Sequence, residues 1–141
     1  MSLNRFKEAQ KGSYASALEE IRSGRKESHW MWYVFPQYKG LGFSSMAKRY
    51  EIQSVEEGME YIQDPLLFSR LKEIASALLE NRSSDPVFVM GYPDNLKLQS
   101  SMTLFFLLSK DPVFLSVLEK YYGGALCAYT ENALRKEGIN R

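Results

Sequence analysis

The sequence contains only one cysteine, Cys127, and only one histidine, His29. A single cysteine cannot form a disulfide within the chain, and one histidine cannot complete the usual shell of a transition metal. We therefore expect no metal and no cofactor. The scarcity of cysteine also favours a reducing compartment, so we expect a cytoplasmic protein.

Charge of one sign is not in excess, because 18 Lys and Arg residues accompany 17 Asp and Glu residues. Proteins that bind nucleic acid usually show a basic stripe and a high pI. The nearest candidate here is the group Arg22, Arg25 and Lys26, which is too small for a phosphate-backbone footprint. Such a group is typical of the solvent-exposed C-terminal end of a helix, where positive side chains interact favourably with the helix dipole. We therefore do not expect nucleic acid as a partner.

Long hydrophobic runs are also missing. The longest run, Leu104–Leu108, is far shorter than the roughly 20 apolar residues that span a bilayer. The first residues, Met1–Glu8, lack the apolar centre of a signal peptide. We therefore expect a soluble protein with no membrane association.

Apolar residues are nevertheless abundant: 45% of the residues are hydrophobic, and the aromatic ones are 2 Trp, 9 Tyr and 8 Phe. This content excludes a disordered chain. A chain of 141 residues buries on folding roughly 68% of the surface that it exposes when unfolded, which suffices for a core. Because the sequence has no internal repeat and no linker, we predict one domain over residues 1–141.

Helical signals recur along the chain. Residues 14–21 carry one apolar stripe and predict a helix that ends near Gly24, after a shorter helix over residues 4–10. Ser54 and Glu57 form a capping-box pattern at the start of another helix. Three Asp-Pro pairs each place a capping carboxylate before a proline at the first helical position. These pairs are Asp64-Pro65, Asp85-Pro86 and Asp111-Pro112.

One segment is apolar nearly all round, over residues 98–108, and such a helix belongs in the middle of a fold. A last helix is expected over Glu131–Lys136, with Thr130 as its cap. We therefore predict an all-α fold, a compact single domain of about six to eight short helices around one central apolar helix.

The most unusual segment, residues 28–37, contains the single histidine and both tryptophans. One interpretation is a buried core element whose ring nitrogens are simply hydrogen-bonded. The other is that His29, Trp30, Trp32 and Gln37 line a pocket. In that case the aromatic faces pack on a flat ligand, and His29 acts as an acid, a base or a hydrogen-bond donor.

A turn punctuated by Gly40 and Gly42 follows, and Ser44 begins a short helix. Backbone N–H groups that glycines leave free, aimed from a helix N-terminus, can hold an anion. The alternative is a structural turn with Ser44 as a cap, since the segment matches neither a dinucleotide fingerprint nor a P-loop.

Polar residues open the central helix: Asp94, Lys97, Ser100, Ser101 and Thr103. Lys97, Ser100 and Thr103 share one helix face, and a lysine with hydroxyl groups suits a phosphate or a carboxylate. In the alternative, Asp94 caps the helix and Lys97 pairs with an acid. The hydroxyl groups then bond to carbonyls one turn earlier.

These segments carry a family resemblance that covers nearly the whole chain. The runs His29–Gln37, Gly40–Ser44 and Lys97–Phe105 together resemble family 1810 of the domains of unknown function, a bacterial family whose members are often labelled calpastatin. The resemblance implies a compact, mainly helical cytoplasmic protein with no established activity. Calpastatin itself is largely disordered, which this aromatic chain is not.

The chain departs from the pattern of that family. Asn95 and Gln99 stand where the resemblance leads us to expect Asp and Arg. An acidic residue expected near the single cysteine is also missing. These departures leave the charge preference of a ligand open.

Our first functional hypothesis is a pocket for a small anionic or nucleotide-like metabolite, because polar groups of several kinds accompany aromatic residues. Whether the protein is an enzyme is left undecided. If it is, His29 would carry acid–base or hydrolytic chemistry, with Lys97 or the glycine turn stabilising negative charge. The alternative hypothesis is a protein-interaction module with an exposed aromatic patch, and a homodimer is one form of it.

Overall fold

The computed structural model describes residues 2–141, and within them the chain forms helices and no strand. The all-α class is therefore confirmed. The ten helices exceed the expected six to eight, since α3 and α7 have only 4 and 5 residues. None of the described helices is both long and apolar enough to cross a membrane. The helices are α1 (Asn4–Lys11), α2 (Tyr14–Arg22), α3 (Met31–Val34), α4 (Ser45–Tyr50), α5 (Val55–Gln63), α6 (Pro65–Glu80), α7 (Pro86–Met90), α8 (Asp94–Ser109), α9 (Pro112–Tyr122) and α10 (Ala128–Lys136).

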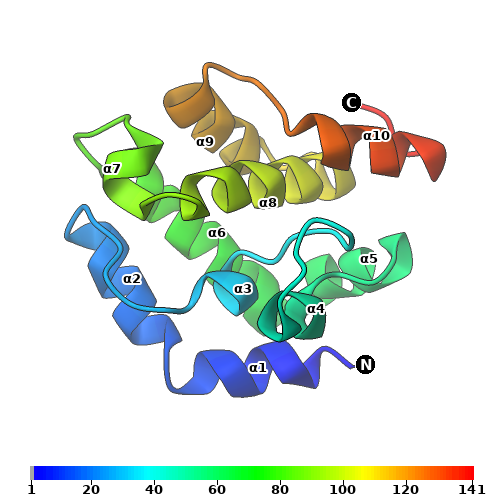
Figure 1. The fold of residues 1–141 in the computed structure, drawn as a ribbon, viewed down its shortest axis with the longest axis horizontal. Coiled ribbons are helices and arrows are strands. Elements are labelled where there is room, and N and C mark those ends of the chain that lie inside the picture. Colours follow the sequence, from blue (N-terminus) through cyan, green and yellow to red (C-terminus); the bar gives the residue numbers. More distant parts are fainter. Residues whose placement is uncertain (1) are drawn as a thin grey trace.

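Helix α8 is the centre of the fold. It runs across the middle of the molecule, with α9 and α10 above it and α1, α3 and α4 below it (Figure 1). It packs against α5, α7, α9 and α10, and its side chains from Leu98 to Leu108 are buried with the exception of Gln99 and Phe106. A helix that is apolar on every side must be surrounded, because no face of it suits water. The predicted central helix is confirmed.

The three Asp-Pro pairs begin helices as predicted. Asp64 accepts hydrogen bonds from the N–H groups of the second and third residues of α6, and Asp85 does the same at α7. Asp111 accepts from the N–H of Val113 at 3.0 Å. These carboxylates satisfy N–H groups that have no partner inside the helix, so the sequence alone indicates where three helices start.

Two capping predictions need correction. Helix α10 begins at Ala128 rather than Glu131, and Thr130 is buried, with its hydroxyl group 3.1 Å from that of Ser100 on α8. The hydroxyl group faces the neighbouring helix instead of its own N–H groups. In the capping box, the hydroxyl of Ser54 accepts from the N–H of Glu57 as predicted, but the Glu57 carboxylate accepts from the N–H of Gln53 and from a side chain of α1.

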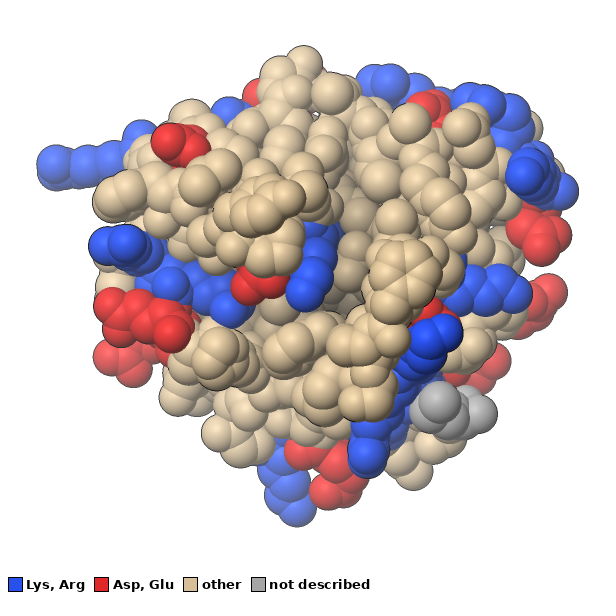
Figure 2. Space-filling model, viewed as in Figure 1, with Lys and Arg blue, Asp and Glu red and all other residues tan. Residues whose placement is uncertain are grey.

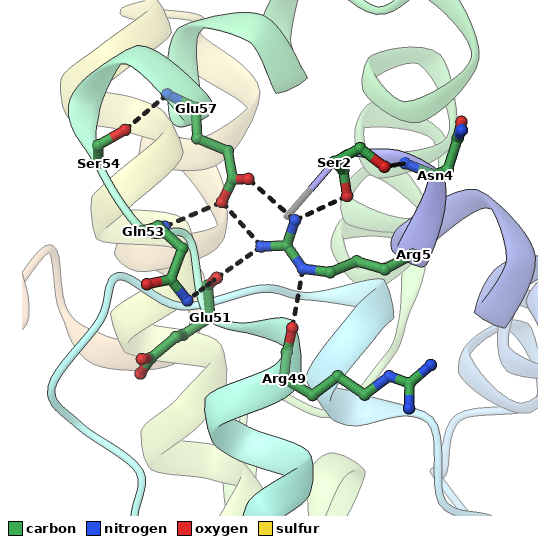
Figure 3. A network of polar contacts seen from close by, with 8 residues as sticks. All are labelled: Ser2, Asn4, Arg5, Arg49, Glu51, Gln53, Ser54 and Glu57. Carbon is green, nitrogen blue, oxygen red and sulfur yellow. Dashed lines mark hydrogen bonds and ion pairs between the residues drawn. The ribbon is translucent and has the colours of Figure 1, made fainter.

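That side chain is Arg5, whose guanidinium joins three segments (Figure 3). It donates to both carboxylate oxygens of Glu57, at 2.8 and 2.9 Å, and to the carbonyls of Arg49 and Glu51, at 2.8 Å each. The two side chains are only 6% and 10% exposed. Burial alone would raise the pKa of Glu57, but the hydrogen bonds from Arg5 and Gln53 outweigh it and lower that pKa. The pair therefore stays charged and ties α1 to the end of α4 and the start of α5.

Replacing Arg5→Ala leaves the Glu57 carboxylate buried without a counter-charge. We expect the free energy of unfolding to fall by about 3–5 kcal/mol, measured by urea denaturation at neutral pH. Arg135→Ala serves as the control, because Arg135 forms an exposed pair with Glu131 within α10. It is expected to cost less than about 1 kcal/mol. Equal losses in the two variants would contradict a structural role of the buried pair.

Candidate functional site

A cleft of about 500 Å³ lies between the segment that joins α3 to α4 and the first turns of α8. The face of the molecule in Figure 2 is hollowed near its centre, and basic side chains reach the edge of that hollow. The walls of the cleft are part polar and part apolar. Its polar lining residues are Gln37, Ser44, Lys97, Gln99, Ser100 and Cys127, and the others are Leu41, Gly42, Phe43, Ala47, Pro93 and Leu96.

Five of the residues singled out in the sequence meet in this cleft. They are Gln37, Gly42, Ser44, Lys97 and Ser100. They come from the loop before α4 and from α8, which are distant in the sequence and adjacent only in the fold. Their part in ligand binding stays a prediction, but one small molecule has room to contact all five.

The aromatic segment contributes little to the cleft. Trp30 is 1% exposed, and its indole N–H donates to the Glu20 carboxylate at 2.9 Å, so it belongs to the core. Burial alone would raise the pKa of Glu20, but hydrogen bonds from Ser28 and Trp30 are among those that lower it to about 2. Trp32 is half-buried in a small depression that adjoins the cleft, and the Lys97 ammonium lies 5.2 Å from its ring centre.

His29 is exposed and is not among the lining residues. Its carbonyl accepts a hydrogen bond from the Tyr33 hydroxyl at 3.3 Å. A catalytic acid or base must reach the reacting atoms directly or through one water. The catalytic role of His29 therefore stays a prediction that the geometry of the cleft does not favour.

The glycine turn is shaped by close packing. Gly40 has a φ of +101°, and a Cβ atom there would overlap the Tyr129 hydroxyl, which donates to the carbonyl of Lys39 at 3.0 Å. A Cβ atom at Gly42 would overlap Ala47 of α4. The hydroxyl of Ser44 caps α4 by accepting from the N–H of Ala47 at 3.1 Å. These contacts account for both glycines and for Ser44 without an anion, as in the structural alternative.

Asp94 lies between two lysines and does not cap α8, whose cap position is Pro93. Its carboxylate is 2.9 Å from the ammonium of Lys26 and 3.5 Å from that of Lys97. The Lys26 side chain is 7% exposed and that of Lys97 is 26% exposed. Asp94 is thus held mainly by Lys26. Its contact with Lys97, at the edge of the cleft, is longer and more exposed to solvent.

Two further polar residues of α8, Ser100 and Thr103, contact the start of α10. The hydroxyl of Thr103 donates to the carbonyl of Gln99 at 2.8 Å and accepts from the N–H of Cys127 at 2.9 Å. Ser100 contacts Thr130, whereas the buried hydroxyl of Ser101 has no hydrogen-bond partner within residues 2–141. Thr103 therefore bonds to the preceding turn as the alternative proposed, and Ser101 and Thr103 do not line the cleft.

Sequence reasoning missed Phe43, Leu96, Gln99 and Cys127 as lining residues. Phe43 lies in the glycine turn, between Gly42 and Ser44, and it is 87% exposed. The spacing of apolar residues in the sequence does not indicate this exposure. Cys127 reaches the cleft only because α10 docks on α8. Within residues 2–141, no group of three His, Cys, Asp or Glu side chains is placed to hold a metal ion.

The fold and the cleft define a compact helical domain with a part-apolar surface site. The chain belongs to the family described as protein of unknown function DUF1810, which matches residues 1–134. It is also similar to the conserved hypothetical protein Rv1873 from Mycobacterium tuberculosis, with 45% identity over 93% of this chain and 94% of that chain, and a TM-score of 0.91. No curated protein matches the chain. The family resemblance is thus confirmed, and it assigns no activity.

Gly40→Ala is expected to destabilise the protein, since the new Cβ atom meets Tyr129 and the backbone conformation disfavours a side chain. We expect a loss of about 1–3 kcal/mol in urea denaturation. Gly12→Ala is the matched control, because nothing lies within 4 Å of a Cβ atom there and no positive φ is involved. It is expected to be neutral or to stabilise by up to about 1 kcal/mol. A neutral Gly40→Ala variant would show that the turn is not held by Tyr129.

Proposed function

We propose that the cleft binds a small metabolite with one anionic group and a flat, nucleotide-like body. The observation that carries this proposal is the charge at the edge of the cleft. Two lysines, Lys26 and Lys97, share the single carboxylate of Asp94. The Asp94 carboxylate lies closer to the buried Lys26 than to Lys97. The ammonium of Lys97 is therefore the donor that is available to a ligand carboxylate or phosphate.

Apolar lining residues of the cleft support a flat or apolar body for the ligand. Phe43 is 87% exposed and Leu96 is 51% exposed, and both line the cleft. Exposed apolar side chains grouped beside polar donors are typical of a binding site. The volume of about 500 Å³ also falls within the usual range for a small-molecule site, roughly 300–1,000 Å³.

Acid–base or hydrolytic chemistry is a further part of the proposal and rests on the sequence alone. It would require His29 to approach a ligand whose anionic group contacts Lys97. A cytoplasmic location is proposed on the same footing, from the single cysteine.

The test is a thermal-shift titration with adenosine monophosphate and benzoate, which pair a flat body with a phosphate or a carboxylate. A ligand that binds only the folded state raises the unfolding temperature. We expect a saturable rise with at least one of the two, and an affinity about tenfold lower in Lys97→Ala, since a charge-assisted hydrogen bond contributes about 1.5–3 kcal/mol.

Lys48→Ala is the matched control, because Lys48 lies on α4 beside the cleft, is exposed and does not line it. The control removes the same charge and is expected to leave the affinity unchanged. An equal loss of affinity in both variants would show that Lys97 acts through the overall charge of the protein and not through a contact with the ligand. No thermal shift with either compound would remove this proposal in its present form.

A protein-interaction module is the second candidate, and one observation favours it. Of the large hydrophobic side chains that are exposed, several lie on α7 or near the start of α8 and the rim of the cleft: Phe43, Val87, Phe88, Tyr92 and Leu96. Exposed apolar side chains of this kind suit contact with a second copy of the chain or with another protein.

This candidate predicts a concentration-dependent dimer in sedimentation equilibrium. Phe43→Ser is expected to abolish the dimer. Leu66→Ser is the control, because it also replaces an exposed apolar side chain with serine, at the start of α6. The control is expected to leave the dimer intact. A monomer at every concentration would count against a homodimer.

A further inference from the structure

A second hollow, of about 410 Å³, lies where the ends of α2 and α6 meet α7. In Figure 1, α7 lies directly above the end of α2, and the N–H of Lys26 donates to the carbonyl of Val89 at 2.7 Å. We propose that this hollow binds an organic phosphate monoester with an aromatic body. The site is separate from the cleft and does not depend on the function proposed there.

Arginines that are far apart in the sequence converge on this hollow. Arg22 and Arg82 line it, and the guanidinium of Arg25 lies 5.4 Å from the ring centre of Phe88, which lines it too. None of the three arginines forms an ion pair within residues 2–141. The guanidinium group presents a planar fork of donors that matches the oxygens of a phosphate, so unpaired arginines around one hollow form a phosphate-binding arrangement.

Asn81 lines the same hollow. Its side-chain amide nitrogen is shielded from solvent and makes no hydrogen bond within 3.5 Å in residues 2–141. Burial raises the pKa of Tyr121, and the Asn81 side chain, which lies near the Tyr121 hydroxyl, opposes that rise. Buried N–H groups in folded proteins are nearly always paired, so an unpaired one calls for an acceptor. A phosphate supplies acceptors only, which suits both this amide and the guanidinium groups.

The charges around the hollow favour a dianion. Glu80 is the one acidic lining residue, against Arg22 and Arg82 in the lining and Arg25 on Phe88. Arg25 itself lines a neighbouring hollow that contains Glu19, Glu20 and Glu27, but within residues 2–141 it forms no ion pair with any of them. A phosphate monoester is a near-dianion at neutral pH, whereas a carboxylate carries one charge, so the excess positive charge selects phosphate.

Hydrogen bonds hold the α6 side of the hollow in place. Lys120 donates from its ammonium to the carbonyls of Leu78 and Leu79, at 3.1 and 2.9 Å, and to that of Asn81. These bonds fix the last turn of α6 and hold a positive charge beneath Asn81. Phe88 is 54% exposed beside this fixed turn, which leaves an aromatic face for the ring of a ligand.

The experiment is a titration of ¹⁵N-labelled protein with phenyl phosphate, followed by amide chemical shifts. We expect saturable shifts confined to residues 22–25 and 81–88. Arg22→Gln and Arg82→Gln are each expected to weaken binding about tenfold, as is usual for the loss of one charge-assisted contact. Arg135→Gln, which removes an exposed arginine on α10, is the control and is expected to change nothing.

A second arm uses inorganic phosphate, and a third uses phenyl phosphate with the variant Phe88→Ser. If the aromatic body contributes, inorganic phosphate binds more weakly than phenyl phosphate, and Phe88→Ser removes the difference. Equal binding of the two compounds would overturn the aromatic part of the proposal. The site itself is overturned by no saturable shift at residues 22–25 and 81–88, or by unchanged affinity in both arginine variants. Shifts confined to residues 41–44 and 96–100 would place the phosphate in the cleft and overturn it as well.

Discussion

The buried ion pair between Arg5 and Glu57 is the contact on which one wall of the cleft depends. The Arg5 guanidinium binds the carbonyls of Arg49 and Glu51 at the end of α4, and the Glu57 carboxylate in the first turn of α5. The loop before α4 is short of internal hydrogen bonds, and it is held through the pairing of residues 37–39 with Ile52. Ile52 lies within residues 49–57, so anchoring these residues to α1 also holds the loop that faces α8. Breaking the ion pair would leave a buried charge uncompensated, at a cost of several kcal/mol.

The other wall follows from the composition of α8. A helix that is apolar nearly all round is buried, so polar side chains along its buried part favour positions where a partner lies inside the protein. Ser100 and Thr103 find theirs at the start of α10, which brings Cys127 to the cleft. At the N-terminal end, where α8 emerges, the polar residues reach the solvent edge and form the cluster of Lys26, Asp94 and Lys97. The same helix thus docks α10 and exposes a charged rim.

Membership in DUF1810 places the chain in a family of unknown function, so the chemistry of the surface carries the functional argument. Both hollows pair basic side chains with an exposed aromatic ring, Phe43 in one and Phe88 in the other. They differ in how the charge is balanced. In the cleft a carboxylate shared by two lysines leaves one ammonium available, whereas around Phe88 the arginines have no ion-pair partner in the described chain. In both proposals these cations would bind the anionic group of the ligand.

Most of the helices, several of their ends and the central position of α8 can be read from the sequence alone, although the short helix α3 cannot. A capping carboxylate or hydroxyl bonds to N–H groups two or three residues away, so its spacing is readable along the chain, as at Asp64, Asp111 and Ser54. Three features depend on how the helices pack: Trp30 belongs to the core, His29 lies outside the cleft, and the Thr130 hydroxyl contacts Ser100 instead of capping α10. The tertiary structure also determines which residues share a hollow, such as Lys97 with Phe43. Those contacts join segments far apart in the chain, and their partners depend on how the helices pack, which no local pattern encodes.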